Sequence, residues 1–176
     1  NTGTYFIEEH LVLTSYFIIG STSRESAGLV KLNKNLSEVY RKDFNKELRK
    51  KRYQDILFSK KKMYLLARDF DKGTKTLTLY ALELNKANAE AQGDWKEITV
   101  FKLDSKRDDF KFKCNLTEDS TRFRMVTAQD GEKNIVYTIQ EFNENFSPAF
   151  KRVDISHDIE PEKIELEDIL ILPNQH

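Results

Sequence analysis

A six-residue phrase occurs twice in this chain, and its recurrence constrains the fold more than any other feature. The two copies are Leu32-Asn33-Lys34-Asn35-Leu36-Ser37 and Phe142-Asn143-Glu144-Asn145-Phe146-Ser147, which begin 110 residues apart. A weaker copy, Leu84-Asn85-Lys86, lies 52 residues after the first and 58 before the last. A repeat of about 55 residues indicates an array of similar structural units rather than one irregular core.

Short runs rich in β-branched and aromatic residues, separated by turn residues, predict strands along the whole chain. The clearest hairpins pair residues 16–20 with 28–32, 63–68 with 76–82, and 122–127 with 134–139. Each hairpin is preceded by a short apolar strand, at 9–13, 53–58 and 110–116, and followed by an outer strand, at 38–44, 95–103 and 149–155. We expect Gly73 to supply the positive φ of the second hairpin's turn. The repeated Asn phrase then forms the turn before the outer strand, with Asn selected for its backbone conformation.

Four antiparallel strands in a unit of roughly 40–60 residues are the layout of a β-propeller blade. The sequence therefore predicts an all-β fold of antiparallel, four-stranded, blade-like repeats, a partial β-propeller with blades at about 5–45, 53–103 and 108–156. The first strand of a fourth unit is expected at 162–172. Closed propellers have 4–8 blades, so we expect residues 1–176 to form one β-repeat domain of a larger chain, with further chain or a partner completing the ring. A β-sandwich is the alternative.

Composition narrows the possible partners and compartments. The 29 basic and 29 acidic residues cancel, which argues against a nucleic-acid partner because such binding rests on neutralising phosphates. Cys114 is the only cysteine, so the chain has no intramolecular disulfide, and we expect its thiol to be packed. No apolar run approaches the roughly 20 residues of a membrane helix, so no transmembrane segment is expected.

The sequence offers no signature of catalysis or of a cofactor. The three histidines, at positions 10, 157 and 176, do not have metal-ligand spacing. No glycine-rich phosphate loop or Gly-x-Ser-x-Gly nucleophile motif is present. We therefore expect a protein that is not an enzyme and that uses no cofactor and no metal.

Two features are candidates for binding. A basic run and a lysine cluster form a candidate surface for a polyanion or an acidic protein: Lys46, Arg49, Lys50, Lys51, Arg52, Lys60, Lys61 and Lys62. The alternative for this run is a solvated linker between blades. Trp95 is a candidate for stacking on a sugar, against the alternative that it packs between strands.

Several phrases resemble the blades of β-propeller proteins of the bacterial cell envelope, which include uncharacterised families. They are residues 77–81 with 93–98, and residues 116–120 followed by 123–126 and 142–146. The resemblance covers about 28–172 and implies a propeller fold and an exported protein, in the periplasm or on the outer-membrane surface. It supplies no catalytic residue.

Together these features predict a non-enzymatic, β-propeller-type protein-binding or scaffold module of the bacterial cell envelope. Such a module presents loops and edge strands to protein partners. A carbohydrate-binding or carbohydrate-processing propeller, with a glycan as ligand, is the alternative. A β-sandwich with an adhesin-like role is a third interpretation.

Overall fold

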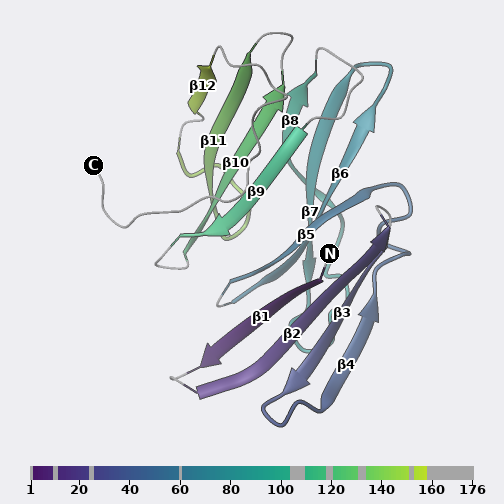
Figure 1. The fold of residues 1–176 in the computed structure, drawn as a ribbon. Coiled ribbons are helices and arrows are strands. Elements are labelled where there is room, and N and C mark those ends of the chain that lie inside the picture. The colour runs from purple at the N-terminus through teal and green to yellow at the C-terminus, as the bar shows by residue number, and fades with distance from the viewer. Residues whose placement is uncertain are drawn as a thin grey trace. The chain divides into compact units, whose positions relative to one another are not determined.

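The computed structural model describes residues 2–9, 12–23, 26–59, 61–103, 110–117, 121–130, 134–150 and 153–157. Over these residues it contains twelve β-strands and no helix, so the predicted all-β class is confirmed (Figure 1). Accordingly, no helix long and apolar enough to cross a membrane occurs in the described part of the chain. The strand expected at 162–172 lies outside the described residues, as do His10, Lys60 and His176.

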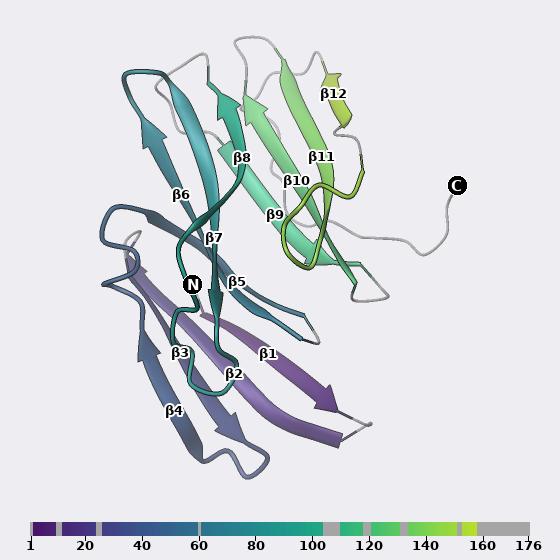
Figure 2. The ribbon, with the colours of Figure 1, turned by 180° about the vertical axis from the view of Figure 1, so that it is seen from behind.

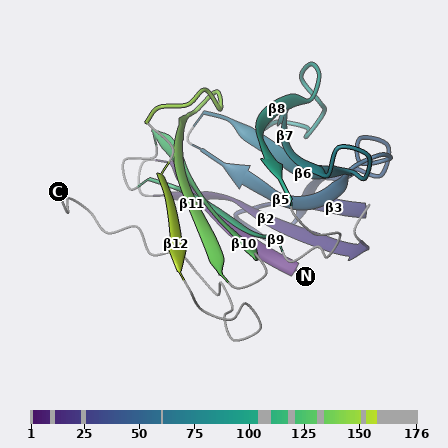
Figure 3. The same ribbon diagram turned by 90° about the horizontal axis from the view of Figure 1, so that it is seen from above.

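The strands form three antiparallel sheets of four, each ordered as a simple meander (Figures 1 and 3). The first sheet contains β1 (Thr2–Glu9), β2 (Val12–Ser23), β3 (Ser26–Asn33) and β4 (Glu38–Asp43). The second contains β5 (Arg52–Phe58), β6 (Met63–Asp71), β7 (Thr76–Leu84) and β8 (Lys96–Lys102). The third contains β9 (Phe110–Leu116), β10 (Arg122–Asp130), β11 (Ile135–Asn143) and β12 (Val153–His157). The predicted four-stranded antiparallel repeats are thus confirmed.

The first hairpin has the predicted register, but the strand expected before it is wrong. Gly20 pairs with Gly28, as the hairpin of 16–20 with 28–32 requires. The expected strand at 9–13, however, spans the end of one strand and the start of the next, since β1 ends at Glu9 and β2 begins at Val12. The residues between Leu13 and Tyr16 are Thr and Ser, which a strand accommodates, so β2 runs through them without a turn.

The chain divides into two compact units. The first comprises Asn1–Ile56, Lys62–Asp69 and Thr78–Thr99, and the second comprises Leu57–Lys61, Phe70–Leu77 and Val100–His176. The first unit therefore holds the whole first sheet and much of the second, while the third sheet belongs to the second unit.

Within the first unit, β4 meets the turn that follows β7 (Figure 2). The Tyr40 hydroxyl donates to the Lys86 carbonyl at 3.3 Å, and the Lys42 ammonium donates to both Glu90 carboxylate oxygens at 3.2 and 3.1 Å. These contacts link the first sheet to the second.

The inner strand β6 is far more buried than the edge strand β4. In β6, Met63–Ala67 are buried without interruption, as expected of an inner strand covered on both faces. In β4, by contrast, every residue is exposed or half-buried. The second unit has a core cluster in which the Phe123 and Phe146 rings stack with centroids 4.8 Å apart, beside the buried Phe142. Cys114 is buried, which confirms the packed thiol.

The first copy of the repeated phrase forms the predicted turn between the third and fourth strands, but not for the expected reason. The side-chain oxygen of Asn33 accepts the backbone N–H groups of Asn35 and Ser37, at 2.9 and 3.1 Å. The positive φ falls on Leu36 (60°) rather than on an asparagine. Asn33 thus stabilises the turn through its side chain, as in an Asx-turn, and not through its own backbone conformation.

The other two sheets repeat this turn. Asn143 accepts the N–H groups two and four residues later at 2.9 and 3.0 Å, and Phe146 has the positive φ of 56°. In the second sheet Asn85 accepts the N–H of Ala87 at 2.8 Å, and one additional residue moves the positive φ to Ala89 (57°). The sequence repeat therefore reflects one turn used three times in the described chain.

The turn of the second hairpin corrects another expectation. Gly73 does not have a positive φ, and the left-handed residue of this turn is Lys75 (54°). Asp71 instead fixes the turn by accepting the N–H groups of Gly73 and Thr74, at 2.7 and 3.2 Å. These bonds to the ionised carboxylate hold the pKa of Asp71 below its usual value.

Replacing Asn33 by Ala is expected to lower the free energy of unfolding by about 1 kcal/mol, because two hydrogen bonds of the turn are lost. Asn35 is the matched control, since only its backbone N–H takes part in the turn bonds described above. Asn35→Ala is expected to change stability by less than about 0.5 kcal/mol. Denaturant unfolding measures both, and equal losses at the two positions would show that the Asn33 side chain has no special role.

Candidate functional site

The fourth strands, and the segments leading into them, carry exposed apolar side chains. Side-chain exposure is described for 19–20, 26–59, 61–103, 111–117, 121–129, 134–150 and 153–156. Over these ranges six large hydrophobic residues are exposed, and all lie on a fourth strand or in the segment leading into it: Leu36, Val39, Val100, Phe150, Val153 and Ile155. We call this set the outer-strand apolar residues. Fourth strands are also sheet edges, whose outward N–H and C=O groups no strand of the sheet pairs. Exposed apolar side chains therefore lie on strands that form the edges of the sheets.

One of these residues is exposed although its counterparts in the other sheets are buried. Leu36, Ala89 and Phe146 occupy the same left-handed position of the repeated turn. Ala89 and Phe146 are 0% and 2% exposed, whereas Leu36 is 63% exposed. The turn geometry does not require an apolar residue to be exposed here, so the exposure of Leu36 is a property of the first sheet.

The basic run is divided by the structure. Phe44 and Leu48 are fully buried and anchor the segment between β4 and β5. Lys46, Arg49 and Lys50 are exposed on it. The acidic residue of the run, at position 47, is turned inward with one carboxylate oxygen 3.5 Å from the Lys42 ammonium. Lys46, Arg49 and Lys50 thus face solvent, whereas the glutamate that stands among them in the sequence points inward.

The other described candidate cations have surroundings of their own. Lys51 lies over the Tyr80 ring, and Arg52 is half-buried at the start of β5. Lys62 pairs with Glu83 at 2.8 Å. Lys61 is exposed, and it belongs to the second unit while the basic run belongs to the first.

Trp95 lies in a small aromatic cluster of the first unit. Its ring meets the Tyr80 ring edge to face, with centroids 6.4 Å apart and an interplanar angle of 80°. The Lys51 ammonium is 3.5 Å from the Tyr80 centroid and 5.7 Å from that of Trp95, which is cation–π geometry. Burial lowers the pKa of Lys51, and the charge of Asp69 partly opposes this shift. Trp95 and Tyr80 are half-buried, so part of each ring faces solvent.

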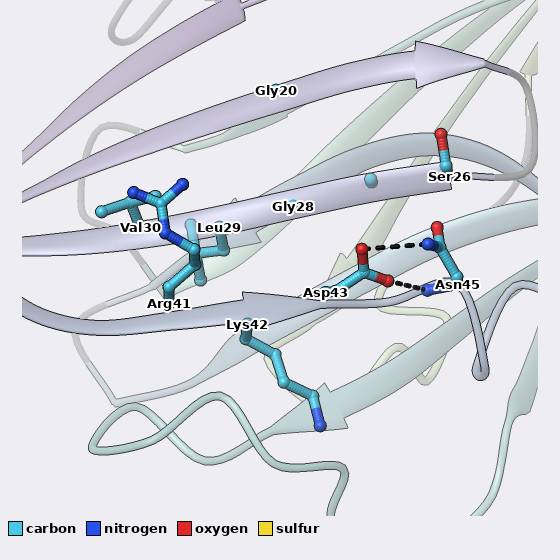
Figure 4. Close-up of a pocket in the computed structure, with 10 residues that line it drawn as sticks. Gly20, Ser26, Gly28, Leu29, Val30, Arg41, Lys42, Asp43 and Asn45 are labelled. Atoms are coloured by element: carbon cyan, nitrogen blue, oxygen red, sulfur yellow. Dashed lines mark hydrogen bonds between the residues drawn. The ribbon is translucent and has the colours of Figure 1, made fainter.

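A groove of about 480 Å³ crosses the outer face of the first sheet (Figure 4). Its lining residues are Gly20, Ser26, Ala27, Gly28, Leu29, Val30, Arg41, Lys42, Asp43 and Asn45. Gly20 and Gly28 are direct cross-strand partners, so two adjacent strands lack side chains in the same row. We call this feature the glycine groove.

The borders of the glycine groove carry opposite charges. Asp43 is the register partner of Gly28, and Arg41 is the register partner of Val30 in the next row. Figure 4 shows Arg41 and Lys42 leaving β4 in opposite directions, as alternation along a strand requires. The Asp43 carboxylate accepts the backbone and side-chain N–H groups of Asn45, at 2.7 and 2.9 Å.

Tyr40 provides a pH-dependent contact at the junction of β4 with the turn after β7. Burial raises the pKa of its phenol to about 12, from an ordinary value of about 10. The folded state therefore holds this proton more tightly than the unfolded state does. Its contribution to stability is complete below about pH 10 and is lost as the pH rises to about 12.

Replacing Tyr40 by Phe is expected to remove this part of the alkaline destabilisation. Between pH 9 and pH 11 the wild-type protein should lose more stability than Tyr40→Phe, by less than about 1 kcal/mol because the ring is half-exposed. Denaturant unfolding of both proteins at the two pH values measures the difference. Identical pH dependence would contradict the assignment to Tyr40.

Sequence reasoning missed two features of these surfaces. The outer-strand apolar residues carried a signal, because Val39 and Val100 lie in strands that were predicted to be outermost. The glycine groove also carried one, because the predicted hairpin places Gly20 opposite Gly28. No group of three or more metal-ligating side chains occurs among the residues that the structure describes.

The chain was compared with known proteins. No protein-family model matches the sequence, and no curated protein matches it significantly.

Proposed function

We propose that this chain is a non-enzymatic, β-propeller-type binding module that presents its fourth strands, and the turns leading into them, to protein partners. The outer-strand apolar residues carry the proposal, since all six exposed large hydrophobic residues lie there among those whose side-chain exposure the structure describes. Buried apolar area contributes roughly 25 cal/mol per Å², so a partner that covers these side chains gains affinity.

The third sheet gives the clearest docking edge. Val153 and Ile155 are both exposed, and residues two apart project from the same face of β12. Asp154 projects from the other face, where its carboxylate accepts the Thr138 hydroxyl at 2.6 Å. An extended partner segment with apolar residues at alternate positions would lie along the outer edge of β12 and cover both side chains.

The similarity of the three sheets supports the proposal of a β-propeller. Each of the three sheets is a four-stranded meander with the Asn-based turn between its third and fourth strands. Propellers are built from such sheets and need 4–8 of them, so further blades would come from more chain or from a partner. We propose the periplasm or the outer-membrane surface as the location of the module, which agrees with the resemblance to envelope propellers.

The test is affinity capture from a bacterial envelope extract, with each captured protein quantified by mass spectrometry. Val153→Lys/Ile155→Lys places charge on the β12 edge, whereas Thr74→Lys/Ala87→Lys adds the same charge at exposed turn positions. We expect proteins captured by the wild-type and control chains to fall at least about tenfold with the β12 variant. Equal capture by all three chains, or no specific capture by the wild type, would reject the proposal.

A glycan-binding module is the second candidate, favoured by the half-exposed Trp95 and Tyr80 rings. Aromatic faces stack on the apolar faces of sugars, and the neighbouring Lys51 adds a cation. On a glycan array, specific binding that is lost in Trp95→Ala and retained in the β12 variant would select this candidate over the first.

A further inference from the structure

The glycine groove is complementary to a second copy of itself. Along β3, Gly28 forms a hollow and Val30, two residues later on the same face, forms a projection. Along β4, Asp43 borders the hollow and Arg41 borders the projection. The row of Gly28 and Asp43 is therefore complementary, in shape and in charge, to the row of Val30 and Arg41.

We propose that two copies of this chain associate face to face through the glycine groove. A two-fold axis running across the strands, midway between the two rows, places Val30 of each copy over Gly28 of the other. The same operation places Arg41 of each copy against Asp43 of the other. A two-fold interface of this kind needs only one surface patch, because each contact occurs twice. Sheets packed face to face keep their strands within about 30° of each other, which this antiparallel arrangement permits.

The side chains on the other face of β3 are buried within the chain. Ala27 and Leu29 border the groove as neighbours of Gly28, but they alternate with Gly28 and Val30 along the strand and are 3% and 0% exposed. Residues of the groove face are exposed or half-buried instead: Gly20, Ser26, Gly28, Val30, Arg41 and Asp43. The surface offered to a second copy is thus the solvent-facing side of a sheet whose inner side forms core.

Arg41 forms an ion pair within the chain, but this contact does not prevent Arg41 from pairing with Asp43 of a second copy instead. Its guanidinium donates to Glu38 at 2.8 Å, and the two side chains are 67% and 46% exposed. Exposed pairs of this kind contribute little to stability. Contact with Asp43 of a second copy would take place in a more enclosed setting, where opposite charges attract more strongly.

Sedimentation velocity over a concentration series tests the association with the full chain. We expect the wild type to form a dimer below about 100 µM and Gly28→Gln to weaken it at least about tenfold, because the new side chain fills the hollow. The variant should fold, since a Cβ at Gly28 meets only the Lys42 carbonyl oxygen, at an ordinary 3.7 Å. Thermal melting checks this, and Lys34→Gln at an exposed turn position is the control.

Charge exchange provides the second arm of the test. Arg41→Asp and Asp43→Arg each bring like charges together and should weaken dimerisation at least about tenfold. The double variant, Arg41→Asp/Asp43→Arg, restores opposite charges and should recover most of the affinity. A wild type that is monomeric at about 100 µM, a dimer that tolerates Gly28→Gln, or a double variant no better than the single ones would overturn the proposal.

Discussion

Replacing Phe146 by Ala is expected to lower the free energy of unfolding by about 3–5 kcal/mol, whereas Leu36→Ala should change it by less than about 0.5 kcal/mol. The two residues hold the same position of the repeated turn, with φ values of 56° and 60°. Alanine keeps a Cβ at both positions, so the cost of the left-handed backbone cancels in the comparison. The difference then measures side-chain burial.

The large effect at Phe146 follows from its packing. Its ring stacks on Phe123 at 4.8 Å and contacts the Phe142 ring at 5.9 Å, and both neighbours are fully buried. Truncation leaves a cavity among these rings that the surrounding sheet fills only in part. Denaturant unfolding with equal m-values gives the comparison. Similar losses of stability at Phe146 and Leu36 would mean that the two side chains are equally buried, which would contradict the structure.

Glu141→Ala is expected to cost about 1–3 kcal/mol. The carboxylate accepts from Arg122 Nη1 at 2.9 Å and from Arg124 Nε at 2.7 Å, and its side chain is only 11% exposed. Removing it leaves two guanidinium groups without their anion. Because about a third of each Arg side chain is exposed, water compensates part of the loss and keeps it below that of a fully buried pair.

The matched control for this prediction comes from the repeat itself. Glu83 precedes Asn85 as Glu141 precedes Asn143, and it pairs with Lys62 at 2.8 Å. Its side chain is 33% exposed, so Glu83→Ala should cost less than about 1 kcal/mol. Urea unfolding compares the two variants without the screening that a charged denaturant adds. If Glu83→Ala were the more harmful change, the argument from burial would be wrong.

Much of the fold follows from local sequence patterns. The Asn phrase predicted a turn before each outer strand, and the structure places one there at Asn33, Asn85 and Asn143. The cause was harder to predict, because no sequence rule assigns a positive φ to Leu36 or Phe146. The start of β2 was missed because Thr and Ser fit a strand as well as a turn.

The candidate surfaces were harder to predict from the sequence than the fold. Whether Leu36 is buried like Phe146 depends on residues distant in sequence, since the turns themselves are alike. The inward orientation of Glu47 likewise depends on Lys42. One signal was available: both Glu83 and Glu141 stand two residues before the turn asparagine, where the first copy has Lys31. Aligning the copies one residue earlier would have shown the two glutamates at equivalent positions.

The proposal that the fourth strands bind a protein partner is tested most directly by site-specific photo-crosslinking in an envelope extract. A photoreactive amino acid at Val153 is expected to crosslink to one or a few discrete proteins, because that side chain is exposed on the β12 edge. The same probe at Thr74, exposed in a hairpin turn, should give no discrete adduct. Discrete adducts from Thr74 and none from Val153 would contradict the proposed role of the fourth strands.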